Sequence, residues 1–295
     1  MNGVINITIF GTMGTNNMKT LKLSNDEYRQ KQGVSNSDLM LIERSPSDYA
    51  WSQNAPRDAL KTAAFDFGTA LHTAMLEPEK FNDQVVVYTQ TKTRETKAFQ
   101  EFMLGQGDGA IILLESEYDK LRFAVDGARH HPAVNRLLTI KSDKEGSIFV
   151  KDKERDIIKK IRPDLDYVSY GLPILGDLKS SADLADWRQD ARWKNPLFTH
   201  GYAHTAAYYM DVASEHYGKS IDEYIFIVVQ KKIEMGRYPV AAITITREEL
   251  EMLGAFDQVN YNLDTYATCL HSNNWDSVEK FPMFGNDGEI LIEDA

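Results

Sequence analysis

The residues best suited to chemistry lie between positions 162 and 180, in the sequence RPDLDYVSYGLPILGDLKS. Asp177 follows an apolar run, and Lys179 comes two residues after it. Because side chains alternate along a strand, Asp177 and Lys179 share one face, whereas Leu178 points the other way into apolar packing. An acid and a base on one face can contact the same substrate.

A second acid, Asp164, precedes Asp177 in an Arg-Pro-Asp sequence. If the segments that carry these two aspartates pair as a hairpin, Asp164 lies beside Asp177, and neighbouring carboxylates repel unless a cation or a proton compensates them. Mg²⁺ or Mn²⁺ suits such a site, because two of these ions about 4 Å apart can stabilise an in-line phosphoryl displacement. Lys179 would then orient or deprotonate the attacking water, or neutralise charge on the phosphorus. The pattern predicts a metal-dependent phosphodiester hydrolase.

A bare Asp-x-Lys motif is a weak signal, since a chain of this composition contains about one or two by chance. The alternative interpretation is a salt bridge between Asp177 and Lys179 at a sheet edge. On these features alone, both interpretations remain open.

The first third of the chain is predicted to be helical. Ser35 or Ser37 caps a short helix, and Ser45-Pro46 ends it and begins another. A longer helix is expected from about Pro56 to Glu77, with His72 deep inside it. The order of elements after it decides the fold class.

The remaining chain alternates between strand-like and helix-like patterns. A strand is expected over 84–88, then a surface loop through the polar and glycine-rich stretch that follows, then a helix pair broken at Pro132. The later segments are a three-strand meander over 146–152, 155–169 and 172–180, helices over 184–195 and 200–218, strands over 223–232 and 238–246, and a last helix from Arg247 to about His271. This order predicts an α+β (mixed α/β) fold, in which helices cover a central mixed sheet.

Length and composition are those of a soluble globular protein. The chain has 295 residues and a mass of 33.5 kDa, which favours one domain over residues 21–295 after a loose extension over 1–20. No apolar run approaches the roughly 20 residues of a membrane span, and the start has no basic signal-peptide region. The single cysteine, Cys269, cannot form an internal disulfide, which suits a cytoplasmic protein.

The net charge of −11 argues against a general nucleic-acid coat protein, because phosphate binding uses clustered Lys and Arg. Basic residues nevertheless concentrate over 151–162, over 187–194 and at Lys231 and Lys232. Two interpretations are open for these clusters: a local basic channel on an acidic body, or ordinary solvated faces of strands and helices.

Several segments together resemble the PD-(D/E)xK nuclease superfamily, particularly its exonuclease VIII (RecE-like) catalytic domain. They are GVSNSDLMLIERSPSDYAW, FDFGTALHTAMLEPEKF, IRPDLDYVSYGLPILGDLKSSAD and HGYAHTAAYYMD, which span roughly residues 33–230. The most specific part is Gly68-Thr69-Ala70-Leu71-His72, followed by Leu76-Glu77-Pro78. The fold that this resemblance implies has a restriction-endonuclease-like core.

The resemblance also implies roles for individual residues. His72, Asp164 and Asp177 would bind the metal together with the backbone carbonyl of Leu178, and Lys179 would be the catalytic base or the residue that orients water.

Further candidates for substrate contact lie in the first and last matching segments. Ser35, Arg44 and Ser45 would help to hold a terminal 5′ phosphate, although helix capping and a solvated arginine are alternative interpretations. Related enzymes carry Gln-x-x-x-Tyr on the helix after the lysine, and the glutamine is missing here. Either His204 with Tyr208 or Thr205 with Tyr209 keeps the spacing that places both residues on one helical face.

The activity that the resemblance implies is a 5′-to-3′ exodeoxyribonuclease with two Mg²⁺ or Mn²⁺ ions. It would act on double-stranded DNA ends and leave 3′ tails for a single-strand annealing recombinase. A homo-oligomeric ring (trimer or tetramer) and the cytoplasm of a bacterium or phage-infected host are the implied setting. An endonuclease of restriction or repair type and a non-catalytic DNA-binding module are the alternatives.

Overall fold

The computed structural model describes residues 20–55, 66–107 and 110–276. Apart from Thr20, the predicted N-terminal extension lies outside these residues, and so does the first part of the helix expected from Pro56. Among the residues described, no helix is both long enough and apolar enough to cross a membrane.

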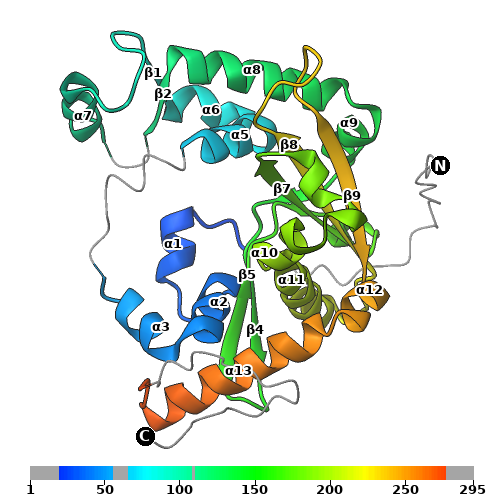
Figure 1. Ribbon diagram of the computed structural model, residues 1–295. Helices are drawn as coiled ribbons and strands as arrows, with labels where there is room; N and C mark the ends of the chain where they lie inside the picture. Colours follow the sequence, from blue (N-terminus) through cyan, green and yellow to red (C-terminus); the bar gives the residue numbers. More distant parts are fainter. Residues whose placement is uncertain (1–19, 56–65, 108–109, 277–295) are drawn as a thin grey trace, which may run out of the picture.

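The centre of the molecule is a mixed sheet with the strand order β3-β6-β7-β8-β9. Figure 1 shows its strands β7, β8 and β9. The strands are β3 (Asp143–Lys144), β6 (Leu165–Asp166), β7 (Ile174–Ser181), β8 (Glu223–Gln230) and β9 (Val240–Thr246). β7 and β8 are parallel, and the other neighbouring strands are antiparallel. The predicted mixed sheet is confirmed, and β7 is an internal strand.

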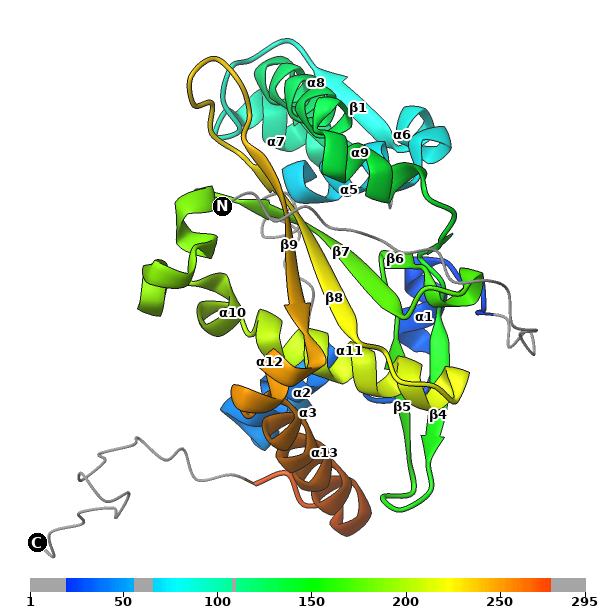
Figure 2. The same cartoon turned by 90° about the vertical axis from the view of Figure 1, so that its right-hand side faces the viewer.

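Helices cover both faces of this sheet (Figure 2). On one face lie α5 (Asp66–Leu76), α8 (Glu115–His130) and α9 (Pro132–Thr139); on the other lie α2 (Asn36–Arg44), α11 (Tyr202–Tyr217) and α13 (Ala255–Ser272). β8 serves both cores, because Ile225 and Ile227 pack on the α8 side while Tyr224 and Phe226 pack on the α11 side. Each such side chain, when buried, stabilises the fold by about 1.5–3 kcal/mol.

Shorter elements complete the fold. They are α1 (Asn25–Gln30), α3 (Pro46–Ser52), α6 (Pro78–Gln84), β1 (Val85–Tyr88), α7 (Lys97–Leu104), β2 (Ile111–Leu114), β4 (Ile148–Asp152), β5 (Ile157–Ile161), α10 (Pro196–Thr199), α12 (Arg247–Met252) and three 3₁₀ helices, η1 (Val168–Tyr170), η2 (Leu184–Trp187) and η3 (Gln189–Lys194). Ser35 caps α2 and Ser45 caps α3, as predicted.

The predicted three-strand meander is wrong. β4 and β5 form a separate two-stranded hairpin, and the short β6 is the strand that pairs with β7. Pro163 separates β5 from β6, and a proline has no N–H to donate to a strand ladder. The chain therefore leaves the hairpin just before Asp164 and enters the central sheet just after it.

The predicted surface loop after β1 is also wrong. The side chain of Thr96 caps α7, whose Phe99 is buried, and all four residues of β2 are buried in a strand parallel to β1. The polar composition of this stretch gave no indication of the β-α-β unit that β1, α7 and β2 form. The last helix is divided into α12 and α13 at Gly254, which has a φ of 68°.

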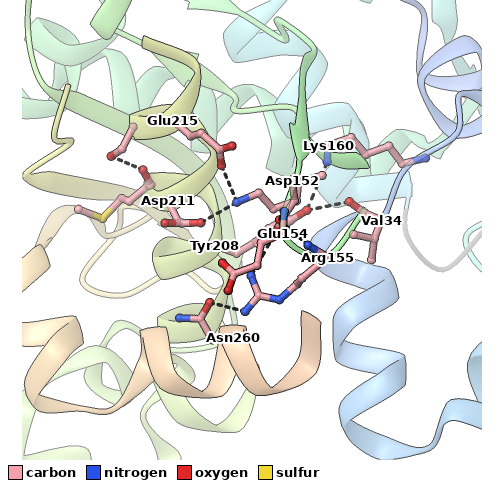
Figure 3. A network of polar contacts seen from close by, with 12 residues as sticks. Val34, Asp152, Glu154, Arg155, Lys160, Tyr208, Asp211, Glu215 and Asn260 are labelled. Carbon is pink, nitrogen blue, oxygen red and sulfur yellow. Dashed lines mark hydrogen bonds and ion pairs between the residues drawn. The ribbon is translucent and has the colours of Figure 1, made fainter. Parts of the chain in front are cut away.

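Basic residues of the β4–β5 hairpin make internal contacts (Figure 3). Lys159 is buried, and its Nζ lies 3.1 Å from Asp211 Oδ2 and 2.7 Å from Glu215 Oε2 on α11. Arg155 contacts Asp152 within the hairpin and, on α13, Asn260 and Asp264. Such pairs offset the cost of burying charge. Neither interpretation of the 151–162 cluster fits these residues, because their charges hold the hairpin against α11 and α13.

Two glycines at the ends of α11 offer a test of backbone strain. Gly201 and Gly218 both have a φ of 63°, but a Cβ at Gly201 would lie 2.3 Å from Met40 Cε, whereas one at Gly218 would meet nothing within 4 Å. We expect Gly218→Ala to lower the free energy of unfolding by about 1–2 kcal/mol through backbone conformation alone. Gly201→Ala should lower the free energy of unfolding by more than Gly218→Ala does, as measured by urea denaturation. Equal losses of this free energy in the two variants would mean that the Met40 side chain moves aside freely.

Candidate active site

α5 brings His72 to the acids of the central sheet. This helix contacts α8, β2 and β7, and His72 Nε2 lies 2.9 Å from Asp164 Oδ1. The same nitrogen lies 3.0 Å from Glu145 Oε1. The imidazole therefore faces the acidic groups.

The β6–β7 pair brings the two aspartates together. Leu165 is paired with Gly176, so the next position in this antiparallel register places Asp164 beside Asp177. The Leu178 backbone N–H also donates to Asp164 Oδ2 at 2.7 Å. The expected pairing of the aspartates occurs, although the hairpin is shorter than predicted.

Lys179 lies on the same face of β7 as Asp177. Its ammonium forms an ion pair with Asp177 Oδ2, and its Nζ lies 5.2 Å from the centre of the Tyr202 ring. Leu178 packs on the opposite side of the sheet, as predicted. The ion pair of the alternative interpretation exists, but it lies on an internal strand and beside a third charged group, Asp164.

The charges of this cluster are strongly coupled. Burial and the neighbouring charge of Asp164 raise the pKa of Asp177 to about 8. Burial also acts to raise the pKa of Asp164, but His72 outweighs it and the pKa is lowered. Burial acts to lower the pKa of His72, and Asp164 reverses this and raises it to about 9. Without a metal, the surroundings of His72 and Asp177 therefore favour their protonated forms, while the Lys179 ammonium opposes protonation of Asp177.

Glu145 is a third acid in the site, which the sequence did not indicate. It has a φ of 54°, and its Oε2 lies 2.7 Å from Arg162 Nε. His72, Glu145 and Asp164 offer ligand atoms that all lie within 4.8 Å of one another. Carboxylate groups are ligands for Mg²⁺ and Mn²⁺, and imidazole is a ligand for divalent transition metals.

The donor atoms at this place suit a cation. Glu145 Oε1 and Asp177 Oδ2 are buried, and each faces a basic group, His72 and Lys179 respectively. Neighbouring carboxylates repel one another unless a cation or a proton compensates them. The residues present therefore fit a divalent metal.

The predicted phosphate-binding residues of the first segment have structural contacts. Ser35 Oγ lies 2.6 Å from Asp38 Oδ2 at the start of α2, and Ser45 Oγ lies 2.8 Å from Ser47 Oγ. Arg44 is exposed and pairs with Asp48. The contacts of these residues are those of helix caps and a surface ion pair.

The two candidate pairs on α11 differ in position. Tyr208 is buried, donates to Val34 O at 2.7 Å and accepts from the Lys160 N–H. Burial is the main cause that raises the pKa of Tyr209, and the charges of Asp177 and Asp164 also raise it. Of the two tyrosines, Tyr209 is the one whose surroundings include the acidic cluster.

His204 and Thr205 belong to a polar network between helices. His204 Nδ1 lies 2.9 Å from Asn36 Oδ1, and its Nε2 lies 3.1 Å from Asn262 Nδ2. Burial lowers the pKa of His204 to about 4, so the ring is neutral. Thr205 Oγ1 accepts from Asn36 Nδ2 at 3.0 Å. These contacts connect α2, α11 and α13.

Three side chains of the site were not assigned a role from the sequence: Glu145, Arg162 and Tyr202. Arg162 directly precedes Pro163-Asp164, and Tyr202 begins the helix that carries Tyr209, so both lie in segments that the sequence singled out. Glu145 had no such signal.

A mixed sheet that carries two aspartates and a lysine on adjoining strands, with a helix histidine facing them, defines a core of the PD-(D/E)xK nuclease type. The chain belongs to the family described as "PDDEXK-like domain of unknown function", whose model matches residues 35–280. The predicted superfamily is thereby confirmed. A comparison with curated proteins found no match.

The coupled charges predict how the stability of the metal-free protein depends on pH. Asp177 has an ordinary pKa of 3.8 and a folded pKa of about 8, so the unfolded chain releases this proton first and stability falls as pH rises between these values. The stabilisation from protonated His72 is complete below 6.5 and is lost as pH rises to about 9.

We therefore expect a lower melting temperature at pH 9 than at pH 6 in EDTA. Asp177→Asn should reduce this dependence, because it removes the titrating acid. A melting temperature that rises over the same interval in EDTA would contradict the assignment of these protons.

Proposed function

We propose that this protein is an exodeoxyribonuclease that requires Mg²⁺ or Mn²⁺ and degrades one strand of double-stranded DNA from its 5′ end. The observation that carries the proposal is the convergence of His72, Asp164 and Asp177 beside Lys179, from segments far apart in the sequence. Membership of the PDDEXK-like family supports nuclease chemistry.

Three side chains, His72, Asp164 and Asp177, would hold the metal together with the Leu178 carbonyl, and Glu145 would add a further carboxylate. The metal, when bound, supplies a Lewis acid and lowers the pKa of a bound water. The N–H of Leu178 fixes one oxygen of Asp164, which leaves the other directed toward His72. This contact orients the acid before any ligand binds.

Lys179 supplies a positive charge beside the acids. Burial alone would lower the pKa of Lys179, but Asp177 and Asp164 raise it, so the side chain is an ammonium at neutral pH. An ammonium can donate to the attacking water or to a phosphate oxygen as negative charge develops there. Of the roles considered for Lys179, orienting water and neutralising charge fit its protonated state best.

Exposed basic residues near the carboxyl ends of β7 and β8 support a DNA substrate. The Lys231 N–H donates to Ser181 O at 2.8 Å, so the chain that leaves β8 lies against the end of β7. Among the side chains that the structure describes in the segments following β7 and β8, Arg188, Lys194, Lys231 and Lys232 are exposed cations, and Arg188 pairs with Asp190. Clustered cations attract the DNA backbone even when the protein is acidic overall.

The finer parts of the proposal depend on the resemblance of residues 33–230 to exonuclease VIII. They are the 5′-to-3′ direction, a trimeric or tetrameric ring, and 3′ tails passed to a single-strand annealing recombinase in the cytoplasm of a bacterial or phage-infected cell. A ring would confine the exposed cations to an inner surface and leave the acidic surface outside.

The test compares DNA with and without ends. With Mg²⁺ or Mn²⁺, we expect the protein to shorten linear duplex labelled at one 3′ end without early loss of that label, and to leave covalently closed plasmid intact. Plasmid nicked once by another enzyme is the control for end requirement. Cleavage of closed plasmid as fast as linear duplex would instead support the endonuclease alternative.

A further inference from the structure

The Lys179 ammonium lies close to an aromatic ring as well as to an acid. Within residues 20–55, 66–107 and 110–276, the carboxylate found within 4.0 Å of Lys179 Nζ is that of Asp177. The other close group is the ring of Tyr202, whose centre lies 5.2 Å from Nζ. The ammonium therefore lies near both a carboxylate and an aromatic ring.

The Tyr202 ring packs between a residue of η2 and a residue of β8. Trp187 is stacked on it, with ring centres 5.4 Å apart and planes 20° apart, and Phe226 lies 5.7 Å away. Phe226 is the residue of β8 that pairs with Asp177, and Trp187 Nε1 donates to Ser181 Oγ on β7 at 3.1 Å. The ring is therefore fixed relative to Asp177 and Lys179.

The two neighbours of Lys179 respond differently to a bound cation. A carboxylate that binds a metal shares its charge with that metal, so its attraction for a nearby ammonium weakens. An aromatic ring attracts an ammonium through its quadrupole, and it gives up none of that attraction to a metal bound by neighbouring acids. Tyr202 is thus the neighbour whose attraction for Lys179 does not depend on metal occupancy.

We propose that Tyr202 is a positioning residue for Lys179, whose ring keeps the ammonium beside the acids when Asp177 binds a metal. This inference rests on the proposed nuclease function. It assigns the role to the ring and none to the hydroxyl group. Phenylalanine at position 202 should therefore preserve the positioning of Lys179, and leucine should not.

The experiment compares Tyr202→Phe and Tyr202→Leu with the control variant Tyr266→Leu. The control removes a buried ring that packs against Tyr49 on α3 and against Trp275, which follows α13. Cleavage of linear duplex is measured at saturating Mn²⁺, Mn²⁺ affinity by calorimetry, and duplex affinity in Ca²⁺. A second readout is the NMR shift of the Lys179 side-chain methylene groups, which a nearby ring moves upfield.

We expect Tyr202→Leu to lower kcat about 3- to 30-fold and to remove the upfield shift, with KM, Mn²⁺ affinity and duplex affinity within about 2-fold of wild type. Tyr202→Phe should retain both kcat and shift. Tyr266→Leu should change the melting temperature only.

Any one of three results would overturn the role of Tyr202 and leave the proposed function standing. They are a wild-type spectrum without the upfield shift, equal losses of kcat in Tyr202→Phe and Tyr202→Leu, and an unchanged kcat in Tyr202→Leu when the wild-type enzyme is active. A wild-type protein that cleaves no duplex with either metal would overturn the proposed function, and with it the role of Tyr202 in catalysis. Presence of the shift in that protein would still locate the ammonium at the ring.

Discussion

Replacing Lys179 with methionine is expected to reduce duplex cleavage on the order of 10³-fold. Methionine keeps an unbranched side chain but has no charge to stabilise a developing phosphate anion or to orient water, and such contributions are each about 10²- to 10⁴-fold. Mn²⁺ affinity should stay the same or rise, because the substitution frees Asp177 from its ion pair. Single-turnover cleavage and calorimetry measure the two effects.

Lys97→Met is the control for loss of a lysine, because Lys97 is exposed on α7 and pairs only with Glu101 among the residues described. It should cleave at the wild-type rate. A Lys179→Met variant as active as this control would show that the lysine has no catalytic role. A non-catalytic DNA-binding module would then be the better interpretation of the same acids.

Asp164→Asn is expected to weaken Mn²⁺ binding by at least about 100-fold and to abolish cleavage. The acid lies between His72 and the Leu178 N–H, and even residues that only support metal ligands contribute about 10- to 100-fold to affinity. Asparagine keeps the size of the side chain and removes its charge. Mn²⁺ binding can be followed by electron paramagnetic resonance.

Asp166→Asn is a matched control two residues further along the chain. Asp166 is fully buried, but it accepts from the Val168 N–H and from the Tyr217 hydroxyl and is not part of the metal cluster. It should cost about 1–3 kcal/mol of stability and leave Mn²⁺ affinity unchanged. Equal loss of affinity in both variants would attribute the effect to folding and not to a ligand.

Local sequence was enough to predict the part of the site that lies on adjacent strands. The alternation of β7 put Asp177 and Lys179 on one face, and the antiparallel pairing that brings Asp164 beside Asp177 joins segments close in the sequence. These are short-range relations of backbone geometry. His72 required the family resemblance, because nothing in a helical pattern alone separates a ligand from a buried histidine.

The remaining features depend on contacts between distant segments. Glu145 reaches His72 through a left-handed backbone conformation at a residue that is not glycine, for which the sequence has no clear signal. The sequence did not indicate the ion pairs of Arg155 and Lys159. Their partners, Asp211, Glu215 and Asp264, lie 50 to 110 residues away and are ordinary surface acids by composition. Tyr202 lies within a segment that resembles the family, but nothing in that segment indicates its position over Lys179, which depends on Trp187 and Phe226.

The contacts of Arg155 also restrict the order of events during synthesis. Its guanidinium joins Asp152 to Asn260 and Asp264, whereas Asp164 follows it by only nine residues. On the ribosome, the hairpin that leads into this aspartate cannot close against α13 until residue 264 has emerged from the exit tunnel. A nascent chain that is stalled before that point carries His72, Asp164, Asp177 and Lys179 without the helix that contacts the preceding hairpin.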